Sequence, residues 1–119
     1  MQASRFPTKN PNPNLMIAST ELHLIVEQEL ADYADGPLIK GVISAVANHE
    51  QQTYAVIVAP DDERLFKPNL VMMARVIDDY VVIDADKSDR PLVDELVRAG
   101  IPREQIICLY AGEQFTTEK

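Results

Sequence analysis

Apolar residues recur at helical spacing in the segment that begins near Ser19. One stripe holds Leu22, Ile25, Val26, Leu30 and Tyr33. Acidic side chains fall largely outside this stripe, so the pattern predicts an amphipathic first helix. We expect Ser19 or Thr20 to cap its start and Gly36-Pro37 to end it. The apolar stripe must then cover another element.

Four runs rich in valine and isoleucine follow and are predicted to be strands. They are Leu38–Val46, Thr53–Ala59, Asn69–Ile77 and Tyr80–Ala85. Asn48–Gln52 is typical of a hairpin turn, and Asp78-Asp79 of a two-residue turn. Sequential hairpins imply an antiparallel meander.

The segment Pro91–Tyr110 predicts a second helix and a last strand. Leu92, Val93, Leu96 and Val97 repeat at helical spacing. Gly100 stands where a helix most easily ends in a left-handed residue, and Ile101 can fold back on the helix. The run Ile106–Tyr110 is apolar enough for an interior strand.

Together these elements predict an α+β fold. An N-terminal helix, a four-stranded antiparallel meander, a second helix and a C-terminal strand follow one another, with both helices on one sheet face. We expect a flexible Pro/Asn-rich arm over residues 1–18, a single domain over 19–112 and a polar tail over 113–119.

Several strands are apolar on both faces, since Val56 and Val58 alternate with Ile57. Either the helices divide between the two faces, or a second subunit covers the open one. Because exposed apolar sheet is costly in a monomer, we expect a homodimer.

The charge balance of the chain indicates which class of partner it can bind. The 119 residues carry 11 basic and 19 acidic side chains, a formal net charge of −8. Nucleic-acid binding draws on basic groups, so we expect a protein partner and no direct contact with DNA or RNA. The sequence shows no apolar run long enough for a membrane and no secretory signal, so we expect a cytoplasmic protein. The single cysteine, Cys108, is expected to be an inert core thiol.

An acidic cluster is the sharpest candidate for chemistry. Asp84, Asp86, Ser88 and Glu95 take positions one, three, five and twelve of an EF-hand loop, but Asp89 stands where that loop needs glycine. We therefore interpret the cluster as a strand end, with Ser88 or Asp89 capping the second helix.

No residue pattern indicates catalysis. The acids in the turns stay solvated, His23 and His49 are expected at the surface, and no spacing of His or Cys indicates a metal site. With 4 glycines and no phosphate-binding loop, we expect no cofactor and no enzymatic activity.

Four residues are candidates for partner contact. Arg75 stands inside a predicted strand, Arg103 and Glu104 follow Pro102 on an exposed step, and Phe6 lies in the N-terminal arm, where it can pack on a neighbouring subunit. For the charged residues, an ordinary surface role is the competing interpretation.

Three segments resemble the XisI-like family, cyanobacterial controlling factors of element excision. Glu29–Ala34 resembles the end of the family's first helix, and Tyr54–Val58 its Tyr-hydrophobic strand. Leu92–Ile106 is similar to the family's ELVxAGIPKxDIVL. The resemblance runs from about Glu21 to Gly112. The chain departs from it in having no Trp and in the step Asp84–Arg90.

The resemblance implies a non-catalytic regulatory protein that binds an XisH-like, nuclease-fold protein or a recombinase. An acidic protein can fill that role through a basic, DNA-handling partner. Two alternatives stay open. One is a divergent assembly module that uses the same fold in an unrelated complex. The other is a small-molecule sensor, or a minor enzyme, with a pocket between the first helix and the sheet.

Overall fold

The first predicted helix is α1, Ser19–Tyr33, in a computed structural model that describes residues 16–36, 38, 40–62 and 64–114. Its buried side chains are Leu22, Ile25, Val26 and Leu30. The capping prediction is wrong. Ala18 takes the N-cap position, and its carbonyl accepts the N–H groups of Glu21 and Leu22. Ser19 and Thr20 lie inside the first turn, where their hydroxyls cannot serve as the N-cap. Pro37 lies outside the described residues.

A five-stranded sheet of order β1-β2-β3-β4-β5 follows. The strands are β1 (Gly41–Asn48), β2 (Thr53–Pro60), β3 (Asn69–Ile77), β4 (Tyr80–Asp86) and β5 (Ile106–Cys108). The first four pair antiparallel, as the hairpin turns predicted. β5 pairs parallel to β4, because α2 (Leu92–Arg98) carries the chain back across the sheet. The α+β architecture is thus confirmed, with a mixed sheet.

Two predicted strand boundaries are wrong. Leu38 makes only an isolated bridge to Gly41, so β1 begins later than expected. The last strand stops at Cys108, and the backbone turns into a short 3-10 helix, η2 (Leu109–Ala111). The Glu113 side chain accepts the Cys108 N–H at 2.8 Å, which closes this end. Leu109 and Tyr110 are consequently exposed.

The end of α2 is formed as predicted. Gly100 has φ 115°, a left-handed conformation that glycine adopts without a steric cost. Its N–H bonds to the Val97 carbonyl, and the Ile101 N–H bonds to the Leu96 carbonyl. This pair of bonds is the Schellman motif, and it turns the buried Ile101 back onto the core.

The prediction that Ser88 or Asp89 caps the start of α2 is wrong. Asp86 Oδ2 accepts the Leu92 N–H at 2.7 Å, and Asp86 Oδ1 accepts the Ser88 N–H at 3.0 Å. Pro91 is the N-cap residue and neither Ser88 nor Asp89 caps the helix. The reason is spacing: the last residue of β4 reaches over the intervening turn to the first helical residue.

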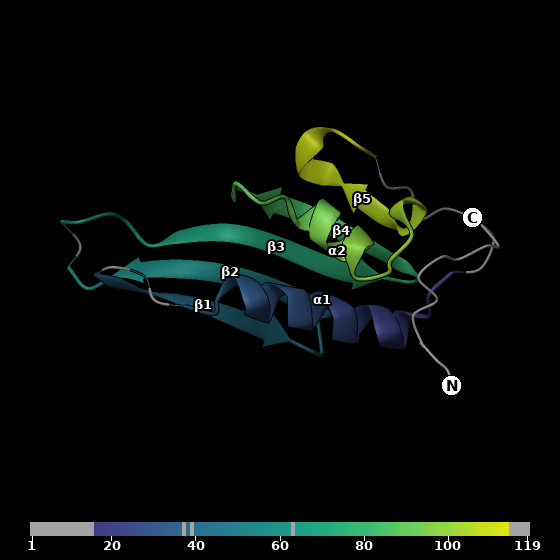
Figure 1. Ribbon diagram of the computed structural model, residues 1–119, viewed down its shortest axis with the longest axis horizontal. Helices are drawn as coiled ribbons and strands as arrows, with labels where there is room; N and C mark the ends of the chain where they lie inside the picture. The colour runs from purple at the N-terminus through teal and green to yellow at the C-terminus, as the bar shows by residue number, and fades with distance from the viewer. Residues whose placement is uncertain (1–15, 37, 39, 63, 115–119) are drawn as a thin grey trace.

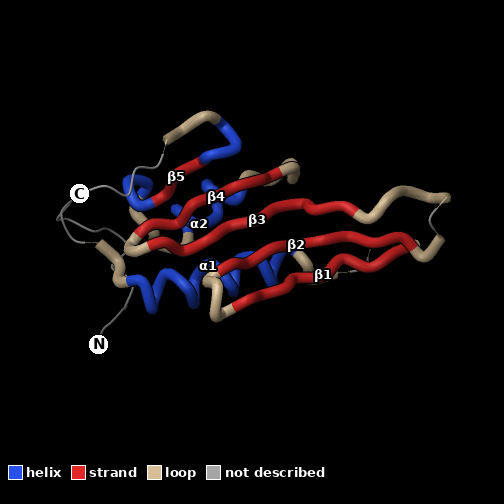
Figure 2. The backbone as a smooth tube through the Cα atoms, turned by 180° about the vertical axis from the view of Figure 1, so that it is seen from behind, coloured by secondary structure: helices blue, strands red, loops and turns tan. Residues whose placement is uncertain are grey.

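Both helices lie on one face of the sheet (Figure 1). One core cluster joins α1 and α2 to that face, with Leu22, Leu30, Tyr54, Met72, Ile83 and Leu96 among its buried members. Seen from behind, the strands lie in front and the helices behind them (Figure 2). Of the two arrangements left open by the sequence, the helices therefore share one face, and the opposite face lacks a helical layer within the described residues.

Gln105 is a fully buried polar residue that fixes three segments. Its side chain accepts the Ile17 N–H at 2.8 Å and donates to the Ile17 and Asp79 carbonyls at 2.9 Å and 2.7 Å. It lies in the 3-10 turn η1 (Arg103–Gln105), directly before β5. Part of the expected arm, Ile17, is thereby bound to the domain.

Candidate partner-binding face

The sheet face turned away from α1 and α2 is the largest candidate site, and we call it the open face. Strand alternation places its side chains opposite the core positions of the same strands. On β1 to β4 the open face includes Val42, Ser44, Val46, Ala55, Ile57, Met73, Arg75, Val82 and Asp84.

Exposed apolar side chains gather at the β1–β2 side of the open face. Val42 is 57% exposed, Val46 45% and Ile57 38%. Across the β1–β2 ladder Ile57 pairs with the small Ser44, and Val46 with the small Ala55. Near β4 the open face is no longer accessible to solvent, because Val82 is fully buried there. An apolar patch of this kind, beside polar groups, is typical of a protein-contact surface.

Arg75 lies on the open face and is held by Asp84. Its guanidinium donates two parallel hydrogen bonds, Nε to Oδ2 and Nη2 to Oδ1, each at 2.8 Å. The bonds to Asp84 raise the pKa of Arg75 above its ordinary value. The extra residue of a β-bulge brings Asp84 to this position, since the β3–β4 register shifts between Met73 and Ala74. The Arg75–Asp84 pair is thus a polar group in a fixed position on a mostly apolar face.

The other predicted contact residues do not join this face. Arg103 donates to Glu113 at 2.6 Å and to the Ile106 carbonyl at 2.7 Å. It also borders a shallow hollow beside α2, lined by Asp94, Val97 and Arg98, on the helical side of the sheet. Glu104 is exposed next to it. Phe6 lies outside the described residues.

A cluster that was not predicted from the sequence joins α1 to the first hairpin. His23 Nδ1 lies 2.6 Å from the Tyr54 hydroxyl, and His49 Nε2 lies 2.9 Å from Glu27 Oε1. Burial and the nearby His49 lower the pKa of His23, and burial together with Glu27 raises the pKa of Tyr54. The sequence feature that could have indicated this cluster is the i, i+4 spacing of His23 and Glu27, which puts both on one side of a helix.

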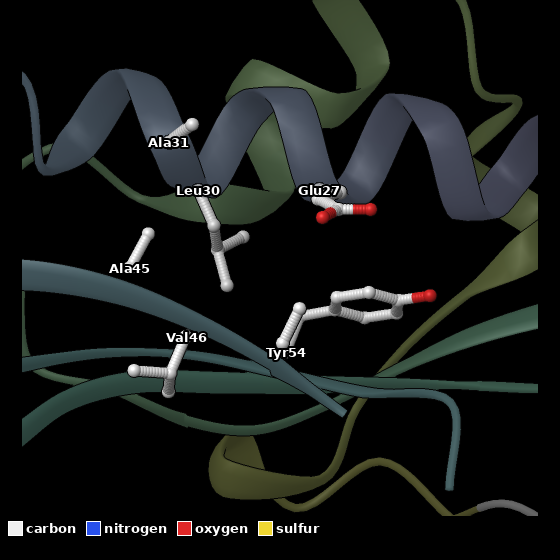
Figure 3. A pocket seen from close by; sticks show the side chains of 7 residues that line it. Glu27, Leu30, Ala31, Ala45, Val46 and Tyr54 are labelled. Atoms are coloured by element: carbon white, nitrogen blue, oxygen red, sulfur yellow. The ribbon is translucent and has the colours of Figure 1, made fainter. Parts of the chain in front are cut away.

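A small pocket lies beside this cluster, between α1 and the first two strands. Glu27, Leu30 and Tyr54 face it, Ala45 points toward α1, and Val46 lies on the far side of β1 (Figure 3). Its volume is about 150 Å³, whereas small-molecule sites usually measure about 300–1,000 Å³. The pocket is thus too small to favour the sensor alternative.

Two further properties of the described residues bear on other functions. No three His, Cys, Asp or Glu side chains in the described ranges are placed to hold a metal ion together. Asp84 and Asp86 are the first two acids of the EF-hand-like cluster. Asp84 accepts hydrogen bonds from Arg75, and Asp86 accepts the backbone N–H groups of Ser88 and of Leu92, the first residue of α2.

None of the described helices combines the length and the apolar character needed to cross a membrane.

Comparisons with known proteins agree on one family. A model of the family described as XisI protein matches residues 16–117. The crystal structure of a XisI-like protein from Anabaena variabilis has a TM-score of 0.68 at 21% identity, covering 76% of this chain and 84% of that one. The fdxN element excision controlling factor XisI of the same organism has a TM-score of 0.64 at 18% identity, covering 77% and 86%. No curated protein matches the sequence.

Proposed function

Because this chain belongs to the XisI family, we propose that it is a non-catalytic regulatory protein of DNA-element excision that binds a nuclease- or recombinase-like protein. The solved relative named as an element excision controlling factor supports the regulatory role through a shared fold. The observation that carries the contact mechanism is the open face, with Val42, Val46 and Ile57 exposed in one patch.

Charge supports a basic protein as the partner. The chain has a net charge of −8, while the open face itself holds one matched pair, Arg75 and Asp84. An apolar patch on an acidic body fits a basic protein, because long-range attraction speeds the encounter and apolar contact then holds the complex. DNA would be repelled by the same charge, so the partner supplies the contact with the element.

Affinity capture from the native host tests this proposal. The full-length chain serves as bait beside two variants, Ile57→Lys on the open face and Val97→Lys on α2. Val97 is 42% exposed, close to the 38% of Ile57, so it is a matched control on the opposite side of the sheet. We expect a DNA-processing protein in the wild-type and Val97→Lys eluates that is missing from the Ile57→Lys eluate.

Mass spectrometry of the three eluates identifies the class of partner. Recovery of only proteins unrelated to DNA processing would contradict the role in excision and favour the assembly-module alternative. Equal recovery of the partner by both variants would show that contact occurs elsewhere on the molecule.

A further inference from the structure

β1 is a long edge strand of the sheet, and no other described strand pairs with its outer side. It is the outermost strand, with eight residues, and within the described part of the chain it pairs in the sheet with β2 alone (Figure 2). The other edge, β5, has three residues, and η2 and the Glu113 side chain close its end. The two edges of this sheet therefore differ in how well they are protected.

The composition of β1 lacks the usual protection of an edge strand. Its residues read GVISAVAN, with no charged residue and no proline. Natural edge strands are normally blunted by lysine, proline, bulges or very short length, because their free N–H and C=O groups recruit another strand. An eight-residue edge without these features fits a strand that another strand covers.

We propose that β1 pairs antiparallel with β1 of a second copy of this chain, across a twofold axis at Ser44. The five strands of each copy then form one continuous sheet. This inference goes beyond the proposed function and does not rest on it, because it needs no DNA-processing partner.

The side chains select this register. In a twofold pairing centred on Ser44, Val42 of each copy lies directly opposite Val46 of the other, on the same face. These are the two large apolar side chains of β1 that are exposed, at 57% and 45%, so each valine covers one of the other copy. Shifting the centre to Ala45 would place Val42 opposite Asn48 instead.

Charge does not select the register. Lys40, just before β1, has φ 62° and so leaves the strand alternation, and Glu50 lies in the turn after β1. The apolar pairs must therefore outweigh the repulsion between two bodies of charge −8.

Pairing through the edge also agrees with the polar part of the open face. A face-to-face dimer would remove the Arg75–Asp84 pair from water. Without further hydrogen-bond partners, the desolvation free energy of such a pair exceeds the attraction between its charges. Edge pairing leaves that pair where it is and joins two open faces into one surface.

Sedimentation velocity of the purified chain over a dilution series tests the proposal. We expect a reversible wild-type dimer. Val42→Lys combined with Val46→Lys places like charges opposite each other twice and should weaken the dimer about tenfold or more. Val42→Glu combined with Val46→Lys should restore it, because each Glu then faces a Lys of the other copy. Within one chain these positions are about 13 Å apart, so the rescue cannot be internal.

Ile57→Lys separates edge pairing from a face-to-face dimer. Ile57 pairs with Ser44 inside its own chain, but it lies one strand in from the edge and faces no residue of the second copy across the axis. Ile57→Lys therefore charges the open face while keeping the Val42–Val46 pairs between the copies, and we expect it to leave dimerisation unchanged. A monomeric wild type would overturn the proposal, as would a dimer that survives the double lysine variant. The interface would instead lie on the open face if Ile57→Lys dissociated the dimer and Val42→Glu combined with Val46→Lys did not restore it. Circular dichroism melts of all variants exclude unfolding as the cause.

Discussion

Single residues decide how the elements of this chain begin and how they are joined. Asp86 is the clearest case, because one carboxylate accepts the Ser88 N–H with Oδ1 and the Leu92 N–H with Oδ2. It ties the end of β4 to the start of α2. The neighbouring Asp89 is exposed.

Replacing Asp86 by Ala should therefore destabilise the fold. Loss of a capping acceptor costs about 0.5–2 kcal/mol of unfolding free energy. Asp89→Ala is the matched control and should change stability by less than about 0.5 kcal/mol. Urea unfolding of the two variants measures both values, and equal losses would contradict the assignment of the cap to Asp86.

His23 should make stability depend on pH. Burial and His49 lower its pKa from 6.5, so the folded protein binds fewer protons than the unfolded chain. Its contribution is complete above the unfolded pKa and is lost as the pH falls through the lowered folded pKa. Stability should therefore rise between about pH 5 and pH 7, the range in which histidine titrates.

Unfolding free energies of His23→Gln over that pH range test the dependence. We expect a shallower rise with pH in His23→Gln than in the wild type. Leu24→Gln changes the next residue of α1, which is 69% exposed, and should keep the wild-type slope. Equal slopes in all three proteins would show that His23 is not the responsible group.

Among the elements, the end of α2 shows how a local signal fixes a tertiary contact. Gly100 at φ 115° reverses the chain and delivers Ile101 to the core. Gly100→Val forces a β-branched residue into the left-handed region and should cost about 1–3 kcal/mol. Gly100→Asn, which tolerates this region better, should cost less. Thermal melts that rank the two variants equally would contradict this interpretation.

Patterns local in sequence predicted the elements well. The stripe of α1, the Val- and Ile-rich runs and Gly100 are signals within a few residues, and they give the helices, the meander and the stop of α2. The hydrogen bonds of Gln105 to Ile17 span 88 positions, so no local pattern reveals them. The bulge that pairs Asp84 with Arg75 is also invisible, because it shifts the register of two strands.

The candidate site was only partly predictable. Apolar residues on both sides of β2 left two arrangements open, helices on both faces or a second subunit over one face. Arg75 lies on the face without helices. Arg103 was chosen for its exposed position in sequence, yet its guanidinium bonds Glu113 and the Ile106 carbonyl. A sequence gives the charge of a residue but not the acceptor that folding places next to it.

At the scale of the whole molecule, one helical layer and one sheet leave the open face for contact. The helices bury one side of the sheet in a single core, and the exposed valines and Ile57 lie on the other side. If the partner is the basic protein that we propose, the net charge of −8 adds long-range attraction to it. Binding should therefore weaken as salt is raised, without disappearing, since apolar contact persists.

The affinity of the captured protein for the purified chain is the most direct test of contact through the open face. Isothermal titration would compare the wild type with Ile57→Lys and Val97→Lys. We predict an affinity at least about tenfold lower for Ile57→Lys, as expected when a charge enters a buried apolar contact. Val97→Lys should bind like the wild type. Wild-type affinity for Ile57→Lys together with a loss for Val97→Lys would place the contact on the helical side and contradict binding through the open face.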